Sequence, residues 1–104
     1  MSERELLRLA AKAAGYGGIK EIDGRYFTCR SNGAGRFAWN PLSNDTQAFR
    51  LSVKLLLSFE IHSDGTAMAG NQDLTIIDKS SEDPNLNARR AIVRAAASIG
   101  EDMP

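Results

Sequence analysis

Apolar and polar residues follow two different periods along this chain, and the period changes from segment to segment. Between residues 2 and 15 the apolar residues recur every three or four positions, which predicts an amphipathic helix. Ser2 and Glu5 have the spacing of a capping box at its start, and Gly15 predicts its end. The expected buried positions are Leu6, Leu9, Ala10 and Ala13, opposite a polar stripe of Arg4, Arg8 and Lys12.

Two later segments show the same helical period. The middle helix is expected to begin near Asn44, with Gln47 completing a capping box. Its predicted buried stripe is Ala48, Leu51, Ser52, Leu55 and Leu56. The last helix is expected to begin after Asp83, with Pro84 at its first position and Asn85 or Asn87 as alternative caps, and to end at Gly100. Its inward residues are predicted to be Ala88, Ala91, Ile92, Ala95 and Ile99, and its outward residues Arg89, Arg90 and Arg94.

The segments between these helices have the features of strands and tight turns. Asp23-Gly24 predicts a hairpin between residues 19–22 and 25–30, because this dipeptide supplies the positive φ angles of a two-residue turn. Residues 31–35 are expected to form a loop, followed by a short apolar strand at residues 37–39.

A meander of three strands is expected after the middle helix. Residues 57–62 alternate with period two, which predicts Phe59 and Ile61 on the core face and Glu60 and His62 in water. A two-residue turn at Asp64-Gly65 would place Ile61 opposite Met68 and His62 opposite Ala67, and a third strand is expected at residues 74–77.

This order of elements predicts a single α+β domain over residues 1–104. The simplest packing is an antiparallel sheet of about four to five strands with three helices against it, an α-β-α sandwich. A chain of this length buries one thin core and leaves little room for a deep cavity.

Composition narrows the classes of function. There are 13 basic and 13 acidic residues, so no bulk field attracts nucleic acid or an anionic membrane, and neither is expected as a partner. No apolar stretch is long enough to span a bilayer, and the first residues are too charged for a secretory signal. The single cysteine, Cys29, excludes an intrachain disulfide and a Cys-rich zinc site, and suits the cytoplasm. No metal or cofactor is expected.

Few residues have the features of a catalytic site. His62 and Glu60 could form an acid–base pair, because residues two apart on a strand point the same way, but both are expected in water. Cys29 and His62 could form a nucleophilic dyad, yet nothing in their spacing supports one. The glycine-rich segments at residues 15–18 and 33–35 lack the strand–loop–helix context of a phosphate-binding fingerprint. We therefore expect no catalytic residue.

Two places are candidates for binding. Arg90 and Arg94 lie one helical turn apart and can converge on one anion or one acidic patch, with Arg89 about 100° away. The alternative is that these arginines form a solvated helix face. The Trp39-Asn40 pair could stack on and hydrogen-bond a planar ligand. The alternative there is that Trp39 fills the core while Asn40 and Pro41 fix the turn into the middle helix.

Three segments resemble small proteins encoded by bacteriophages and prophages. Residues 39–45, followed by Ala48 and residues 50–55, resemble the Trp-Asn-Pro turn that enters the middle helix of the phage α-β-α sandwich family. Residues 83–96 are similar to the Ala- and Arg-containing final helix of that family and of the NinX-like phage proteins, with Asp-Pro here in place of their Asn-Pro. Residues 6–16 are similar to their opening helix. The resemblance implies an α-β-α fold and a phage-borne accessory gene, and it transfers no catalytic residue.

The function expected from these observations is non-enzymatic binding. Small phage accessory proteins often act on host or defence machinery, so the expected partner is a host or defence protein in the bacterial cytoplasm. The alternative is a homo-oligomer that binds or sequesters a small phosphorylated ligand of the nucleotide type.

Overall fold

The computed structural model describes residues 2–30 and 35–104, so residues 31–34 of the expected loop lie outside the described part of the chain. The elements are α1 (Glu3–Ala13), β1 (Lys20–Ile22), β2 (Arg25–Cys29), β3 (Arg36–Ala38), α2 (Asp45–Lys54), β4 (Ser58–Ile61), β5 (Ala67–Gly70), β6 (Thr75–Asp78) and α3 (Pro84–Glu101).

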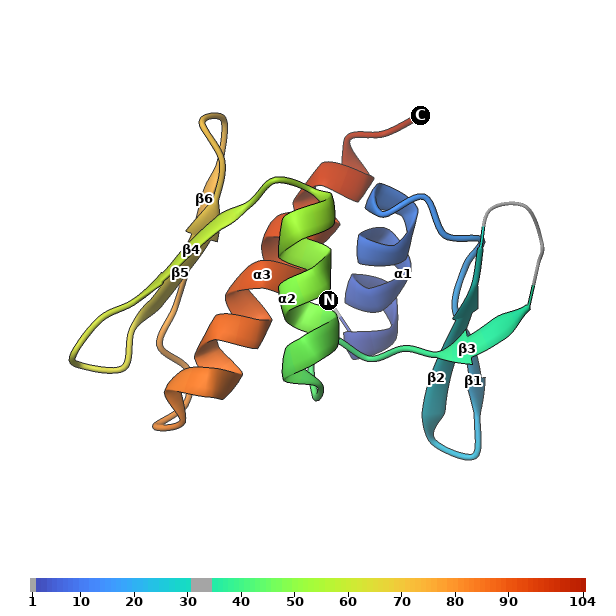
Figure 1. Cartoon of the computed structure of the whole chain (residues 1–104), viewed down its shortest axis with the longest axis horizontal. Coiled ribbons are helices and arrows are strands. Elements are labelled where there is room, and N and C mark those ends of the chain that lie inside the picture. The colour runs from blue at the N-terminus through green and yellow to red at the C-terminus, as the bar shows by residue number, and fades with distance from the viewer. Residues whose placement is uncertain (1, 31–34) are drawn as a thin grey trace.

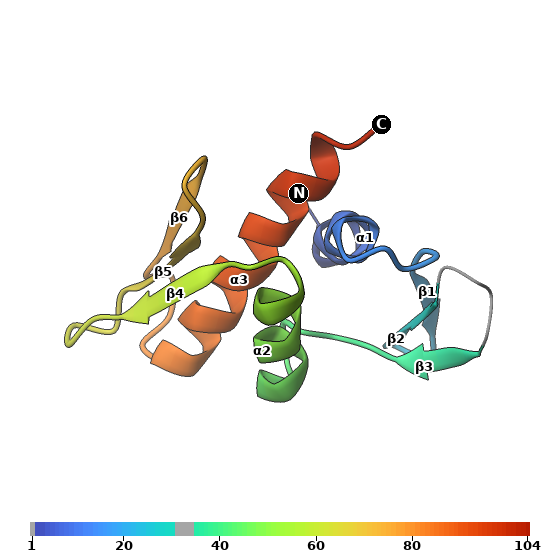
Figure 2. The ribbon, with the colours of Figure 1, turned by 45° about the horizontal axis from the view of Figure 1, so that its top comes forward.

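The fold is α+β, with three helices between two small antiparallel sheets (Figure 1). The sheets have the strand orders β1-β2-β3 and β4-β5-β6. The α+β class, the three helices and the antiparallel pairing are as expected, whereas a single sheet of about four to five strands within an α-β-α sandwich is wrong, because the helices lie between two three-stranded sheets. The chain runs from β3 through α2 to the other side of the helices before β4 begins, so the two strand runs do not meet. Figure 2 shows the same arrangement after rotation.

Each helix begins with the predicted capping side chain. A cap accepts a hydrogen bond from a backbone N–H group that has no partner within the helix. The three pairs are Ser2 with Glu5 at 3.1 Å, Asn44 with Gln47 at 2.9 Å, and Asp83 with Asn85 at 3.0 Å.

α3 is the central element of the structure. It contacts α1, α2, β4, β5 and β6. Its buried residues lie all around the helix and most are small: Asn87, Ala88, Ala91, Ile92, Val93, Ala95, Ala96, Ala97 and Gly100. A Cβ atom at Gly100 would overlap the backbone carbonyl oxygen of Leu9, so α1 and α3 touch at their backbones there. Small side chains are therefore needed for several elements to pack around one helix.

The predicted buried faces of α1 and α2 need correction. In α1 the buried residues are Leu7, Leu9, Ala10 and Ala11, so the stripe is rotated from the predicted one and leaves Leu6 half-buried. In α2 the predicted burial of Ala48, Leu51 and Ser52 is confirmed. The helix ends at Lys54, however, and Leu56 lies beyond it with 84% of its surface exposed.

The β4–β5 register differs by one residue from the expected one. Ile61 pairs with Ala67 and Glu60 with Met68. The turn holds three residues rather than two: the His62 N–H donates to the Thr66 carbonyl at 2.8 Å, and Gly65 adopts a φ of 89°. A left-handed glycine at the end of the turn is the usual geometry of three-residue hairpin loops. Asp23-Gly24, in contrast, forms the predicted two-residue turn, with φ angles of 53° and 77°.

Trp39 joins the β1-β2-β3 sheet to the helices. Only 4% of its surface is exposed, which favours its role as a core residue. Its ring makes an edge-to-face contact with Tyr16 at 5.6 Å between centroids, and Tyr16 contacts Phe37 in the same way at 5.5 Å. Pairs of this geometry stabilise a fold beyond the area that they bury.

We predict that Trp39→Ala lowers the free energy of unfolding by about 3 to 5 kcal/mol, the usual loss for a buried large aromatic side chain. Chemical denaturation of both proteins measures the difference. A loss below about 1 kcal/mol would show that the β1-β2-β3 sheet does not depend on Trp39 for its attachment.

Candidate functional site

Arg89, the first of the predicted binding arginines, ties α3 to α2. Its Nη1 atom lies 2.6 Å from Asp45 Oδ1, and its Nε–H donates to the Leu42 carbonyl at 2.9 Å. Only 17% of its side chain is exposed. Two donor atoms of this guanidinium, Nε and Nη1, are therefore bonded within the protein itself.

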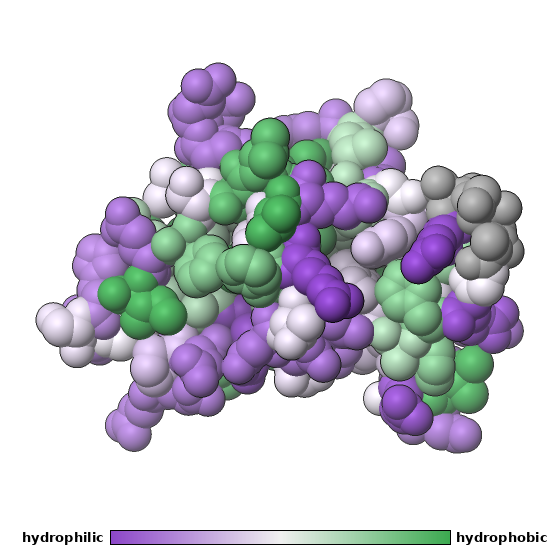
Figure 3. All heavy atoms as spheres, viewed as in Figure 1, coloured by the Kyte–Doolittle hydropathy of each residue, from purple (hydrophilic) through white to green (hydrophobic). Residues whose placement is uncertain are grey.

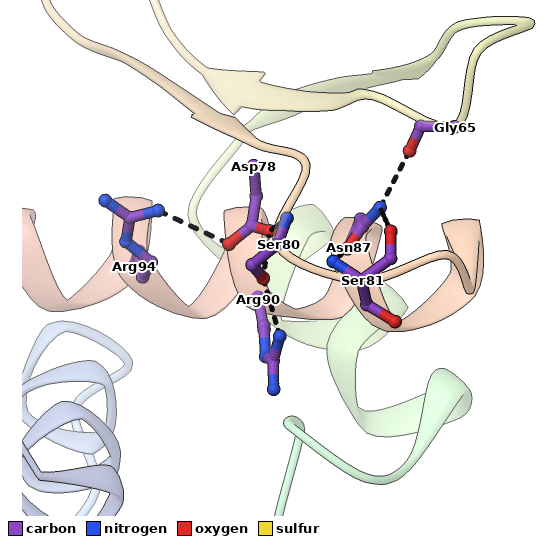
Figure 4. A network of polar contacts seen from close by, with 7 residues as sticks. All are labelled: Gly65, Asp78, Ser80, Ser81, Asn87, Arg90 and Arg94. Atoms are coloured by element: carbon purple, nitrogen blue, oxygen red, sulfur yellow. Dashed lines mark hydrogen bonds and ion pairs between the residues drawn. The ribbon is translucent and has the colours of Figure 1, made fainter.

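Arg90 and Arg94 converge, as their spacing predicts, but on a loop of their own domain (Figure 4). Arg94 Nη1 lies 3.3 Å from Asp78 Oδ2, and Arg90 Nη1 donates to Ser80 Oγ at 2.6 Å. The hydroxyl and backbone N–H of Ser80 both donate to Asp78 Oδ1, at 2.7 and 2.9 Å. The two arginines thus fasten the loop between β6 and α3.

Asn87 completes this network from the buried side of α3. It is fully buried, and its side chain donates to the carbonyls of Gly65 and Ser81 at 2.9 and 2.8 Å while accepting from the Ser81 N–H at 3.0 Å (Figure 4). A buried amide with all these bonds fixes the loop conformation and resists rearrangement.

Asp78 is the one carboxylate buried in this network. Only 4% of its side chain is exposed. Burial alone raises the pKa of Asp78, but the hydrogen bonds from Ser80 and the charge of Arg94 outweigh it and hold the pKa below its usual range. The ionised form is therefore the one that stabilises the fold at neutral pH.

Trp39 and Asn40 line a hollow of about 310 Å³ between β2 and α2. Asn40 is engaged in the turn: its Oδ1 accepts from the Leu42 N–H at 3.1 Å, and its own N–H donates to Gln47 Oε1 at 2.6 Å. With Trp39 buried, its ring is not available for stacking, and the Asn40 side-chain oxygen is already bonded within the turn. Binding by this pair remains a prediction.

The candidate catalytic pairs do not form an enclosed site. Glu60 Oε2 and His62 Nε2 are 3.2 Å apart, with 71% and 48% of their side chains exposed. Cys29 ends β2 and His62 follows β4, so the two lie in different sheets on opposite sides of the helices (Figure 1). Across residues 2–30 and 35–104 no cluster of three metal-ligating side chains is found, and no helix there is long and apolar enough to cross a membrane.

An exposed apolar surface covers α2 and β4, and the sequence analysis did not identify it. Phe49 and Val53 lie on α2 and Leu56 lies just beyond its C-terminal end, with 56, 56 and 84% of their surfaces exposed. Phe59 and Ile61 on β4 are 40 and 48% exposed. We call these five residues the α2–β4 face. Figure 3 shows apolar residues gathered over α2 and the neighbouring sheet.

Phe59 and Ile61 point to the predicted side of the sheet but are not covered. Their cross-strand partners Ala69 and Ala67 are buried beneath α3, which confirms that these residues share the inner face. β4, however, is one of the two edge strands of its sheet, and α3 covers mainly β5 and the other edge strand, β6. The expectation that Phe59 and Ile61 belong to the core is therefore wrong.

Two hollows border the α2–β4 face. One of about 200 Å³ lies between α2, β4 and α3, walled by Phe49, Phe59 and Ile61 over a floor that includes Ala48 and Ala88. The other, of about 600 Å³, adjoins Leu56 and Phe59 and extends over the β5–β6 turn. The smaller hollow, between Phe49 and Phe59, has the shape into which a partner inserts an apolar anchor, whereas the larger one is lined partly by polar side chains such as Glu60, Asn71 and Asp73.

Leu56 is held in a backbone conformation that does not suit it. Its φ is 56°, in the left-handed region that commonly ends a helix and that glycine or asparagine occupies at least cost. A leucine there costs about 1 kcal/mol or more, and its exposed side chain gains nothing from burial in this chain.

A signal for this face is present in the sequence. The segment from Ala48 to Leu56 also contains Phe49 and Val53, which the predicted stripe left unassigned and which widen the apolar side of the helix opposite Arg50 and Lys54. An apolar side wider than one buried stripe is more than a single neighbouring element covers.

Comparison with protein-family models, curated proteins and solved structures found no match to this chain.

We predict that Arg94→Gln lowers the free energy of unfolding by about 1 kcal/mol at pH 7, because it removes a charged partner from a buried carboxylate while half of Arg94 is already in water. Asp78 has a lowered pKa in the folded state, so its contribution is full above the pKa of the unfolded chain and is lost as the pH falls through the folded value. The difference between variant and wild type should therefore shrink below about pH 4.

Urea denaturation at pH 7 and at acidic pH measures this difference. Arg50→Gln is the matched control, because Arg50 is exposed on α2 and lies outside the network. A difference in the free energy of unfolding between Arg94→Gln and the wild type that stays constant with pH would mean that Arg94 does not act through Asp78.

Proposed function

We propose that this chain is a non-catalytic binding module that acts by holding another protein against the α2–β4 face. The observation that carries the proposal is the set of five large apolar side chains exposed on one surface. Fully burying a side chain of this kind contributes about 1.5 to 3 kcal/mol. All five side chains are partly exposed in the isolated chain, so burial of their exposed parts against a partner would contribute further free energy.

The size of the face matches a protein contact better than a small-molecule site. Open side chains of this size offer about 150 to 250 Å² each, so the exposed fractions correspond to roughly 500 Å² of apolar surface. An interface of standard size buries about 800 Å² on each partner, somewhat more than half of it apolar. Two phenylalanines in the face provide the aromatic anchors that dominate such contacts.

The proposed partner is a host or defence protein in the bacterial cytoplasm. This choice of partner is supported by analogy. Residues 6–16, 39–55 and 83–96 resemble phage-encoded accessory proteins. In this proposal the partner contributes an apolar side chain to the hollow between α2, β4 and α3.

The alternative, capture of a small phosphorylated ligand, has one observation in its favour. Arg90 and Arg94 line a hollow of about 270 Å³ between α1 and α3, and phosphate is a preferred ligand of paired arginines. Against it, both guanidinium groups already donate to Ser80 and Asp78, and Glu3 lines the same hollow. Capture of a small phosphorylated ligand is therefore the less favoured of the two functions.

Affinity capture from bacterial lysate tests the proposal. The wild-type chain should retain a stoichiometric protein, and the double change Phe49→Glu plus Val53→Glu should lose it, because carboxylates cannot enter an apolar contact without a large desolvation cost. Ile77→Glu is the matched control, since Ile77 is 59% exposed on β6 and outside the α2–β4 face.

Equal retention by the double variant and the wild type would contradict the proposal. A phosphorylated small molecule that co-purifies with the wild type, and that Arg90→Gln plus Arg94→Gln releases, would favour the alternative.

A second prediction separates folding from binding at one residue. Leu56→Gly should raise the free energy of unfolding by about 0.5 to 1 kcal/mol, because glycine adopts the left-handed conformation at little cost. The same change should weaken partner capture. Thermal or chemical denaturation of the two proteins measures the first effect, and a clear loss of stability would show that Leu56 belongs to the fold.

A further inference from the structure

We infer that, in the free protein, the α2–β4 face is covered by a second copy of this chain, related by a two-fold axis with the two α2 helices antiparallel. The inference rests on the proposed function, because it uses the same face. Another protein would then bind by displacing the second copy.

The shape of the face is the first argument for a second copy. The groove between α2, β4 and α3 opens beside Asp45, Ala48 and Phe49, at the N-terminal half of α2. The most exposed apolar side chain, Leu56, projects just beyond its C-terminal end. Projection and groove thus occupy opposite ends of one helix. An antiparallel pair brings each Leu56 to the groove of the other copy, so that one contact is made twice.

The spacing along α2 fits this arrangement. Phe49 and Val53 are four residues apart on α2, the spacing of side chains on one face of a helix, and Leu56 follows just beyond the helix end. When Phe49 of one copy meets Leu56 of the other, the midpoint of the helix pair falls next to Val53. Each Val53 then contacts its own counterpart near the two-fold axis.

Charge and area also permit self-association. The chain has a formal net charge of zero at pH 7, so two copies approach without long-range repulsion. No charged residue is among the five that make up the face. The roughly 500 Å² of apolar surface is about what one side of a standard two-protein interface contributes. An uncovered patch of this size on an uncharged protein is otherwise prone to non-specific association.

Sedimentation equilibrium over a wide concentration range tests the dimer. The wild-type chain should pass from the mass of one chain, 11.3 kDa, to twice that mass as the concentration rises. Phe49→Lys and Leu56→Glu should each weaken dimerisation at least about tenfold, because each places two charges in the contact. The control Ile77→Glu should leave the dimer unchanged.

A mixture of the two weakened variants tests the antiparallel pairing. Lys at position 49 of one chain would face Glu at position 56 of the other, while the second such contact keeps Phe49 against Leu56. The mixture should therefore form mixed dimers at concentrations where each variant alone is monomeric. Mixed dimers that form no better than the single-variant dimers would overturn the antiparallel arrangement.

Two results would overturn the dimer itself. They are a wild-type chain that stays monomeric at all concentrations, and a dimer that tolerates both changes in the face. Neither result decides the proposed function, because the capture experiment tests binding of another protein independently. If the wild-type chain is monomeric but captures a partner protein, and the Phe49→Glu plus Val53→Glu variant does not, the proposed binding function still holds.

Discussion

Close packing around α3 is the constraint on which the rest of the structure depends. Gly100 has no room for a side chain against the Leu9 carbonyl, and alanines occupy most of the buried positions of the helix. Because α3 is thin, α1, α2 and the β4-β5-β6 sheet can all contact it. Its arginine side chains extend between these elements, and Arg89, Arg90 and Arg94 bond to the neighbouring segments.

The same constraint explains why α2 is left open. α3 contacts one side of α2, while Val53 and Leu56 are left exposed and Phe49 lies at the hollow between α2, β4 and α3. β4 lies at the edge of its sheet, where α3 covers it less than β5 and β6. The surface that α3 fails to cover is therefore apolar and continuous across two elements. A surface of that kind is a feature of proteins that bind other proteins.

The helix caps could be predicted from the sequence. Which surfaces are covered by elements distant in the sequence could not. Ser2, Asn44 and Asp83 cap the helices because capping depends on residues three or fewer positions away. The exposure of Leu56 and Phe59 depends on how far α3 extends over β4, which no local pattern encodes. The arginine stripe could be predicted from the sequence. Its pairing with Asp78 could not, because Asp78 lies 16 residues from Arg94. The β4–β5 register was missed because one dipeptide, Asp64-Gly65, fits both two- and three-residue turns.

Hydrogen–deuterium exchange, measured on the wild-type chain at low and at high protein concentration, tests the central claim most directly. The account predicts that α3 exchanges most slowly at both concentrations, because its opening requires the whole core to separate. It also predicts that higher concentration slows exchange in α2 and β4 and leaves β1, β2 and β3 unchanged. Exchange in α2 and β4 that is independent of concentration, combined with an α3 less protected than the elements around it, would contradict both the central role of α3 and the covered α2–β4 face.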